Sequence, residues 1–405
     1  MDVSNRPGRR TRDSGEIRSE RIDDVAALPM VRWSSVEARP LVIAGPCSAE
    51  SEEQLHETAR RLSGVRVDYL RAGIWKARTR PNSFEGIGTP ALQWLKSAGR
   101  EFGLRTATEV ARAEHVEAAL RADIDLLWVG ARTTTNPFSV QEVAIALRGC
   151  DVPILVKNPT SRDLGLWIGA IERIAAVGVE ALAAVHRGVT EAWSAPYRNA
   201  PAWDMAIEFR RRLPQVPLLC DPSHICGRRD LIRGVAQHAL DLGYDGLMIE
   251  AHRDPDRAWS DADQQVTPER LGEILSELIR RAPEPTTETS VRMLEDLRRQ
   301  IDGVDRSLVA LLAERAGIVD LIGSLKRKEN VMPLQPVRWR RLLRDRMAQA
   351  IELGLDPGYV KTLYELIHGD SVRRQSDIVS GVTERPEATG RIAAGNDPHG
   401  GDRNG

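Results

Sequence analysis

Eight short apolar runs recur along the chain, and each is followed by a turn and then by a longer segment with helical periodicity. The runs span residues 41–44, 67–70, 104–108, 126–130, 154–156, 181–185, 217–219 and 246–249. This alternation predicts parallel strands joined by crossover helices. Eight such units in about 240 residues are typical of a closed (β/α)8 barrel. An open doubly wound sheet usually carries a GxGxxG turn after a strand, and this sequence has none.

The chain has 405 residues, of which 41% are apolar, and this is enough to build two compact cores. After the last run, the segment 282–290 (APEPTTETS) combines prolines with small polar residues, as a linker does. Both chain ends are polar and lack periodic apolar positions. We therefore predict an α/β barrel followed by a small all-α domain. The predicted divisions are a disordered tail at 1–32, the barrel at 33–281, a linker at 282–291, the helical domain at 292–375 and a disordered tail at 376–405.

Charge and cysteine content limit the binding partners and the cellular compartment that we expect. The formal net charge is -1, with 57 Lys and Arg against 58 Asp and Glu, so electrostatics favour neither a nucleic acid nor a membrane as a partner. The four cysteines form no CxxC pair, and the arginine-rich start lacks the apolar run of a signal peptide. We expect reduced thiols, a cytoplasmic protein and small-molecule substrates.

Four residues with metal-ligand chemistry come just after strand-like runs, and we expect four separate strands to carry them. They are Cys47, His224, Glu250 and Asp261. Because the carboxyl ends of barrel strands meet at one rim, a thiolate, an imidazole and two carboxylates would converge there. The sequence therefore predicts an open site for one divalent metal ion.

Cations also follow the predicted strands. They are Arg71 and Lys76 after the second, Arg132 after the fourth, Lys157 at the fifth and Arg187 after the sixth. Arginine captures carboxylate or phosphate in a bidentate manner, and lysine adds a compact charge. Five cations beside one metal predict a pocket for phosphorylated, carboxylate-bearing substrates.

Seven motifs across the barrel region occur in the order of a known family. They are GPCSAES, RAGIWKARTRPNSFEG, VGAR, VKNP, HRG, CDPSH and IEAHRDPDRAWSDADQQ. Together they resemble the 3-deoxy-D-arabino-heptulosonate 7-phosphate (DAHP) synthases, which condense phosphoenolpyruvate with erythrose 4-phosphate.

The resemblance implies a role for each matching residue. Cys47, His224, Glu250 and Asp261 would hold the metal, with Mn²⁺ expected and Fe²⁺, Co²⁺ or Zn²⁺ also compatible with these ligands. Arg71, Lys76, Arg132, Lys157 and Arg187 would hold phosphoenolpyruvate, with Lys76 also counted as catalytic. Arg78 and Thr79 would clamp the phosphate of erythrose 4-phosphate.

One position departs from the family pattern, since Ala77 replaces the proline of the usual Lys-Pro-Arg-Thr clamp. Alanine there is similar to the sister enzyme, 3-deoxy-D-manno-octulosonate 8-phosphate synthase, which uses arabinose 5-phosphate. That reaction stays open as an alternative, although Arg78-Thr79 followed by Pro81 follows the heptulosonate pattern.

After the linker, apolar residues recur at steps of three and four and predict one long helix with a coiled-coil-like seam. Arg315 interrupts this seam between Leu311 and Ile318. At about 100° per residue, Lys326 falls about 20° from Arg315 around the helix, whereas Arg298 points about 100° away. This arrangement predicts an intertwined homodimer in which Arg298 serves the partner's pocket.

Two further helices are predicted at 337–353 and 357–375. The run LEDLRRQIDGVDRSLVALLAER, with Lys326, Arg338 and the later DSVRRQ, resembles the all-helical chorismate mutases. The resemblance implies that chorismate rearranges to prephenate here without acid-base groups. The residues implied to bind or act on it are Arg298, Arg315, Lys326, Gln335, Arg338, Ser371 and Gln375.

Trp339 stands where that family has a glutamate, and Gln335 stands where it often has an acid. Tryptophan cannot orient a ligand as a carboxylate does, so a second interpretation stays open. In that interpretation, the helical domain only binds ligand and dimerises. Since prephenate lies downstream of the synthase product, prephenate bound to the helical domain is a candidate feedback inhibitor of the barrel.

Overall fold

The computed structural model describes residues 40–76, 84–192 and 194–382. Contacts divide the chain into two compact units, one ending at Pro283 and the other beginning at Glu284. The division lies within the stretch predicted as a linker. In the described part of the chain, no helix has the length and apolar character that crossing a bilayer requires.

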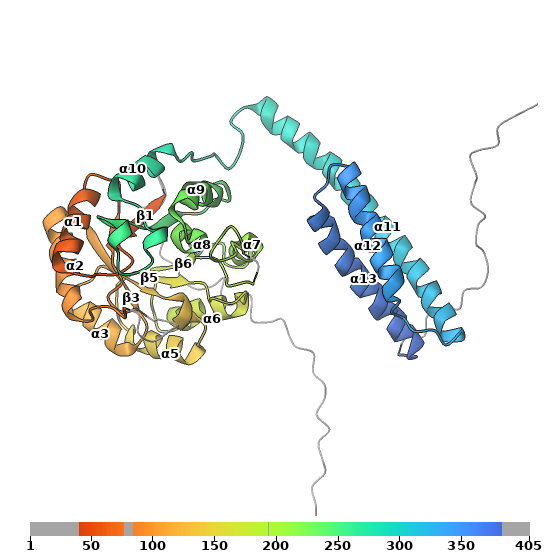
Figure 1. Cartoon of the computed structure of the whole chain (residues 1–405), viewed down its shortest axis with the longest axis horizontal. Helices are drawn as coiled ribbons and strands as arrows, with labels where there is room; N and C mark the ends of the chain where they lie inside the picture. The colour runs from red at the N-terminus through yellow and green to blue at the C-terminus, as the bar shows by residue number, and fades with distance from the viewer. Residues whose placement is uncertain (1–39, 77–83, 193, 383–405) are drawn as a thin grey trace, which may run out of the picture. The chain divides into compact units, whose positions relative to one another are not determined.

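The first unit is a closed barrel of eight parallel strands in sequence order, with β1 paired to β8 (Figure 1). The strands are β1 Leu41–Gly45, β2 Tyr69–Arg71, β3 Arg105–Val110, β4 Leu126–Val129, β5 Ile154–Lys157, β6 Leu182–His186, β7 Leu218–Cys220 and β8 Gly246–Glu250. Each contains or overlaps one of the apolar runs. The predicted (β/α)8 barrel is therefore confirmed.

Alternation along each strand creates two apolar layers. Side chains such as Ile43 and Trp128 fill the barrel interior, whereas their neighbours Val42 and Val129 pack outward against helices. The surrounding helices are α1 Glu52–Leu62, α2 Pro90–Phe102, α3 Ala113–Arg121, α4 Ala131–Thr134, α5 Pro137–Ala146, α6 Leu164–Ala175, α7 Trp203–Arg212, α8 Pro222–Cys226, α9 Ile232–Asp241 and α10 Pro268–Glu277. Short 3-10 turns are η2 Arg229–Leu231, η3 Pro255–Arg257 and η4 Ala262–Gln264.

The second unit contains three helices, α11 Glu288–Lys328, α12 Pro336–Glu352 and α13 Pro357–Val379. Two predicted boundaries are wrong. Helix α11 begins inside the predicted linker because Thr287 accepts a hydrogen bond from the Ser290 backbone N–H and caps the helix. Helix α13 continues beyond 375, into the stretch predicted as a disordered tail, because buried Ile378 packs close to Gly323 of α11.

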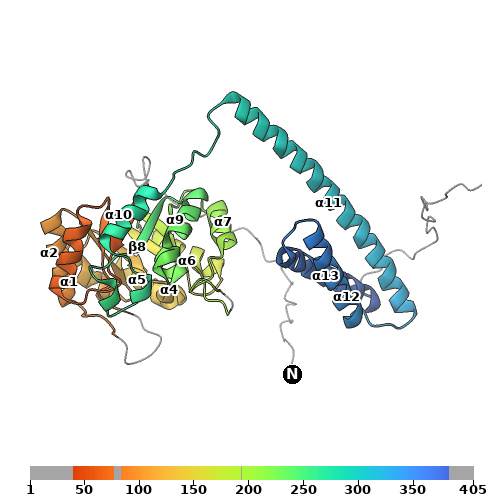
Figure 2. The same cartoon turned by 45° about the horizontal axis from the view of Figure 1, so that its top comes forward.

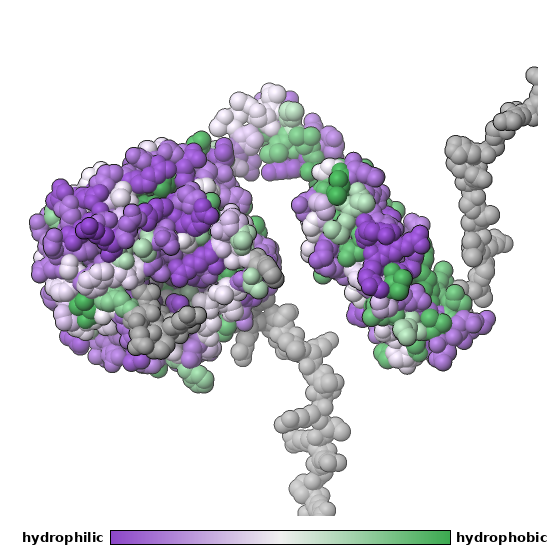
Figure 3. Space-filling model, viewed as in Figure 1, coloured by the Kyte–Doolittle hydropathy of each residue, from purple (hydrophilic) through white to green (hydrophobic). Residues whose placement is uncertain are grey.

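The helical unit buries few apolar side chains. Among its described residues, Val319, Ala350, Val360 and Ile378 are the buried apolar side chains. Figure 2 shows that α12 and α13 lie beside the C-terminal part of α11 and leave its N-terminal part uncovered. Apolar surface is visible on this unit in Figure 3. The uncovered stripe comprises Leu297, Ile301, Val304, Leu308 and Leu311, which are 47% to 61% exposed.

Candidate active sites

Three of the four predicted metal ligands gather at the barrel rim. Donor atoms of Cys47, Glu250 and Asp261 all lie within 4.8 Å of one another. The fourth, His224, places Nε2 3.8 Å from Glu250 Oε1. The expectation of four separate strands is wrong, because Glu250 ends β8 and Asp261 lies in the connection that follows the same strand. Three strand ends therefore supply four potential ligands.

The backbone brings these groups close at some conformational cost. Asp261 adopts φ of 46°, in the left-handed region that aspartate tolerates better than most residues. At the end of β1, Gly45 has φ of 148°, and a Cβ there would lie 2.1 Å from the carbonyl oxygen of Arg71. Only glycine allows β1 and β2 to approach this closely beside the site.

The protonation of this cluster follows from burial and charge. Burial and the nearby Glu250 carboxylate raise the pKa of Cys47 to about 12. Burial lowers the pKa of His224, which keeps its imidazole neutral. Burial opposes ionisation of Asp261, but the charge of Arg198 opposes that effect, and the pKa of the carboxyl is lowered.

This donor set fits a divalent cation. A neutral imidazole and ionised carboxylates are the forms that bind metal, and a cation would expel the thiol proton from Cys47. Cys47, His224, Glu250 and Asp261 could together hold one ion.

Two buried cations adjoin the cluster. Arg71 donates to Glu250 Oε1 at 3.1 Å, and Lys157 donates to Asp221 Oδ2 at 2.6 Å. Both charges lie over the ring of Trp128, at 4.9 Å for Arg71 and 5.7 Å for Lys157. The indole thus forms an apolar wall that shields both cations from water and strengthens their field.

Lys76 contacts the cluster directly. Its Nζ donates to Cys47 Sγ at 3.1 Å and to the Cys47 carbonyl oxygen at 2.8 Å. Burial alone would lower the pKa of Lys76, but Cys47 and Glu250 raise it above its ordinary value. The ammonium group is therefore held charged at the rim.

Arg187 and Arg132 extend the positive surface. The Arg187 backbone N–H donates to Asn158 at 2.7 Å, and its guanidinium donates to Asn199 at 2.9 Å. Burial lowers the pKa of Arg187 to about 10, and the charges of Arg198 and Arg132 add to that effect. Arg132 is exposed in α4. Of the predicted clamp, Arg78 and Thr79 lie outside the described residues.

Several site residues escape the sequence-based prediction. Asp221 accepts from Lys157 and lies 2.8 Å from His224 Nδ1, so it orients one cation and one potential ligand. Arg198 pairs with Asp261 at 3.2 Å and donates to Gln264 at 2.7 Å. Asp221 and Gln264 belong to the motifs CDPSH and DADQQ, which offered a signal. Arg198 lies in none of the motifs, so the sequence contains no signal for its place in the site.

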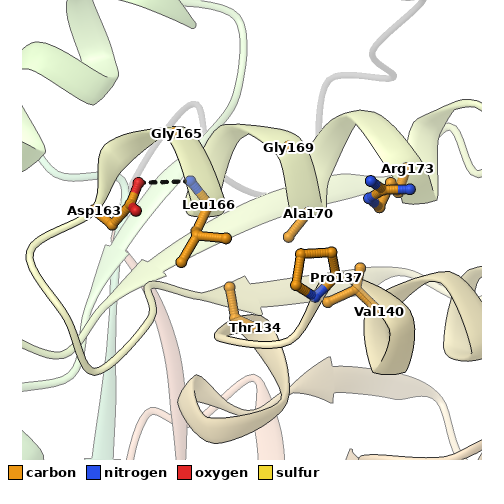
Figure 4. Close-up of a pocket in the computed structure, with 9 residues that line it drawn as sticks. All are labelled: Thr134, Pro137, Val140, Asp163, Gly165, Leu166, Gly169, Ala170 and Arg173. Carbon is orange, nitrogen blue, oxygen red and sulfur yellow. Dashed lines mark hydrogen bonds between the residues drawn. The ribbon is translucent and has the colours of Figure 1, made fainter.

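A separate cavity of about 340 Å³ lies on the outer helical layer, between the α4–α5 segment and α6 (Figure 4). Its lining includes Pro137, Val140, Leu166 and Ala170, and Asp163 caps α6 at its edge by accepting from the Leu166 N–H. None of the predicted site residues lines this cavity. It is distinct from the rim.

The helical unit brings four predicted residues together. Arg315 donates to Ser371 Oγ at 2.7 Å, and Lys326 donates to Gln375 Oε1 at 2.8 Å. Lys326 also donates to the carbonyl oxygen of Pro333 at 2.6 Å. Ser371 and Gln375 are buried, and both cations are half-buried. A cationic pocket thus forms between α11 and α13.

The other three predicted residues of this pocket are exposed. Arg298 lies on the uncovered part of α11, and Gln335 and Arg338 lie at the start of α12. Within the described part of the chain, none of the three forms a hydrogen bond or ion pair with the four gathered residues. A single chain therefore assembles part of the predicted pocket.

Known family models match both units of the chain. Residues 35–283 match the model of the DAHP synthetase I family. The chain belongs to this family. Residues 297–376 match the chorismate mutase type II model. The two domains make the chain a bifunctional enzyme of the shikimate pathway, with transferase and isomerase parts. The DAHP synthases are generally metal-dependent, in agreement with the Cys47, Glu250 and Asp261 cluster.

Individual relatives cover the barrel. A phospho-2-dehydro-3-deoxyheptonate aldolase from Thermotoga maritima is 32% identical over 237 residues, covering 58% of this chain and 68% of the relative. A crystal structure of the enzyme with that name from the same organism has a TM-score of 0.53 and 30% identity, covering 59% and 67% of the two chains. A 2-dehydro-3-deoxyphosphooctonate aldolase from Geobacter sulfurreducens is 27% identical, covering 59% of this chain and 92% of the relative.

Proposed function

We propose that the barrel condenses phosphoenolpyruvate with erythrose 4-phosphate to give DAHP and inorganic phosphate. The observation that carries this proposal is the buried Cys47, Glu250 and Asp261 cluster flanked by Arg71 and Lys76. The methylene carbon of phosphoenolpyruvate attacks the aldehyde carbon, water adds to the neighbouring carbon that bears the phosphate, and inorganic phosphate leaves by cleavage of the bond between that carbon and the phosphate oxygen.

Different residues of the rim bind different parts of the two substrates. Arg71, Lys157 and Arg187 hold the carboxylate and phosphate of phosphoenolpyruvate, together with Lys76 and Arg132. Arg78 and Thr79 hold the phosphate of the aldehyde substrate. Lys76 also faces charge that develops at the reacting carbons, in a site sheltered from water.

One divalent ion would be held by Cys47, His224, Glu250 and Asp261, and when bound it supplies Lewis-acid polarisation of the aldehyde. Mn²⁺ is our expected ion, while Fe²⁺, Co²⁺ and Zn²⁺ suit the same mixed donors. The reduced state of a Cys47 ligand suits the cytoplasm, where we place the enzyme.

Consumption of phosphoenolpyruvate by the full chain tests the synthase. Reactions would contain erythrose 4-phosphate, arabinose 5-phosphate or no aldehyde, each with added Mn²⁺ or with a chelator. We expect loss only with erythrose 4-phosphate and metal. Loss only with arabinose 5-phosphate would support the octulosonate reaction, which Ala77 and the Geobacter relative keep as the second candidate. No loss in any metal-loaded sample would refute both.

For the helical unit, we propose that it rearranges chorismate to prephenate as a homodimer. The pocket of Arg315, Lys326, Ser371 and Gln375 supports this proposal, with Arg298 supplied by the partner copy and Gln335 and Arg338 contributed by α12. These cations would hold the two carboxylates and face charge on the ether oxygen, so the reaction needs only a compressed conformer.

The alternative, a domain that binds ligand and dimerises without turnover, is favoured by Trp339. The decrease of chorismate absorbance with time distinguishes the two interpretations. We expect turnover by the full chain and none by Arg315→Ala, whereas binding of prephenate without any turnover by the wild type would support the binding module.

Prephenate is our proposed feedback inhibitor of the barrel. Synthase rates at saturating prephenate, measured in the wild type and in Arg315→Ala, test this. We expect inhibition of the wild type that the variant loses. Equal rates with and without prephenate in the wild type would refute the proposal.

A further inference from the structure

An aromatic pair joins α12 and α13 in the helical unit. The rings of Trp339 on α12 and His368 on α13 stack with centroids 4.0 Å apart and an interplanar angle of 21°. Both side chains are half-buried. Because indole and imidazole are flat and tightly stacked, Trp339 restricts the imidazole to a narrow range of orientations.

The pair lies on the pocket side of α13. At about 100° per residue, His368 points within about 60° of Ser371 and about 20° of Gln375 around the helix axis. Those two residues accept hydrogen bonds from Arg315 and Lys326. A titratable ring therefore shares a face with the polar residues that hold both cations.

The charged surroundings of His368 are asymmetric. Helix α11 presents Arg315 and Lys326, and helix α12 presents the neutral Trp339. On α13 itself, Glu365 lies one turn away and is paired with Lys361 at 3.4 Å. Tyr364 also lies one turn away. The groups that act electrostatically on the imidazole are thus cations. A bound anion would strongly change the electrostatic potential at the imidazole.

We propose that His368, held by Trp339, is a further ligand-binding residue of this pocket, where its imidazole takes up a proton and donates a hydrogen bond to a carboxylate of the bound dianion. This inference rests on the proposed function of the helical unit. It assigns a positioning role to Trp339, which stands where the resemblance leads one to expect a glutamate, because the indole holds the imidazole of His368 by stacking.

The direction of the coupling follows from charge. In the free protein, burial and the charges of Arg315 and Lys326 lower the pKa of His368 below its ordinary value of 6.5. A bound dicarboxylate compensates those charges and raises the pKa of the imidazole. Between the free and bound pKa values, binding takes up protons, so affinity increases as pH falls through this window.

Calorimetric titration of the full-length homodimer with prephenate tests the proposal. Titrations at about pH 6 and about pH 8 would each be done in two buffers that differ in ionisation enthalpy. We expect proton uptake in the wild type and affinity up to about tenfold tighter at the lower pH, because each unit of pKa shift is worth a factor of ten.

Three variants separate positioning from titration. His368→Gln keeps a hydrogen-bond donor but cannot titrate, so it should bind with little pH dependence and no proton uptake. His368→Phe keeps the aromatic stack without a donor and should bind several-fold more weakly at the lower pH. His238→Gln changes an exposed barrel histidine and should behave as the wild type.

The outcomes distinguish this inference from the function on which it rests. Wild-type binding without proton uptake, or uptake that persists in His368→Gln, would overturn the role of His368 alone. Absence of any prephenate binding by the wild type at either pH would overturn the mutase pocket together with it. Uptake that His368→Gln abolishes and His238→Gln retains would support the proposal.

Discussion

The barrel and the helical unit differ in how far one copy of the chain completes them. In the barrel, Ile43 and Trp128 are fully buried, and the ion pair of Arg71 with Glu250 is at most 1% exposed on either side. In the helical unit, Ile301 and Val304 on α11 are 59% and 60% exposed. The described part of the barrel therefore gathers its candidate metal ligands within one chain, whereas the helical unit gathers only part of its predicted pocket and exposes an apolar stripe.

The largest expected effect tests whether the barrel site works independently of the helical unit. Cys47→Ala removes the thiol donor, so the synthase rate should fall by about a hundredfold or more while chorismate turnover is unchanged. Phosphoenolpyruvate consumption, metal content and chorismate loss would be measured on one preparation. Cys150→Ala, at a half-buried thiol remote from the rim, is the control. Full metal content and an unchanged rate in Cys47→Ala would contradict the ligand assignment.

Next comes the packing of the barrel beneath that site. Gly45→Ala places a methyl group against the Arg71 carbonyl, and we expect a loss of about 3 kcal/mol in the free energy of unfolding. Gly149→Ala is the matched control, because Gly149 also has positive φ, 77°, but has open space around it. Gly149→Ala should lower the free energy of unfolding by about 1 kcal/mol. Urea unfolding followed by tryptophan fluorescence measures the free energy of unfolding of both variants. Equal losses would show that the close approach of β1 and β2 does not affect stability.

A smaller effect tests whether the exposed apolar stripe of the helical unit is a dimer interface. Leu308→Glu puts a charge in the exposed stripe of α11 and should raise the dimer dissociation constant about thirtyfold, from a loss of about 2 kcal/mol per dimer, or about 1 kcal/mol from each chain. Arg306→Glu, on the opposite face of α11, should leave the dimer intact. Sedimentation velocity over a concentration series gives the answer. A dimer that tolerates the first variant as well as the second would place the interface elsewhere.

The smallest effect, per unit of pH, concerns the acid sensitivity of the barrel. Burial lowers the pKa of His186 from 6.5 to about 3, and its Nδ1 lies 2.9 Å from the Tyr244 hydroxyl. The unfolded chain therefore binds a proton that the folded barrel does not. Stability should decrease by about 1.4 kcal/mol per pH unit as pH falls from 6.5 towards 3. His186→Asn should show a shallower slope in urea unfolding than either the wild type or His238→Asn, and identical slopes would refute this role.

The sequence predicted the barrel well because strand periodicity and rim chemistry are both local signals. An apolar run locates a strand, and the topology of a barrel then brings the carboxyl ends together without further information. That is why Cys47 and Glu250, about 200 residues apart, could be assigned to one site.

What escaped prediction depends on partners that are distant in the sequence. Arg198 joins the site through its contacts with Asp261 and Gln264, and no periodicity in the sequence predicts those contacts. The start of α11 is a different case, because Thr287 three residues before Ser290 is a typical helix N-cap. The nearby prolines favoured a linker in the prediction. The end of α13 could not be read, since it depends on Ile378 packing against another helix.

The pairing of β1 with β8 closes the barrel, and the proposed metal site lies on that seam. Gly45 pairs with Glu250 in register, the Cys47 N–H donates to Gln265, and the hydroxyls of Ser48 and Ser260 are 2.6 Å apart. An ion bound there would fasten the first strand of the barrel to the last. The four proposed ligands are all present on a growing chain only after the eighth strand and the connection that follows it have been synthesised, so the proposed site would form only when the barrel is complete.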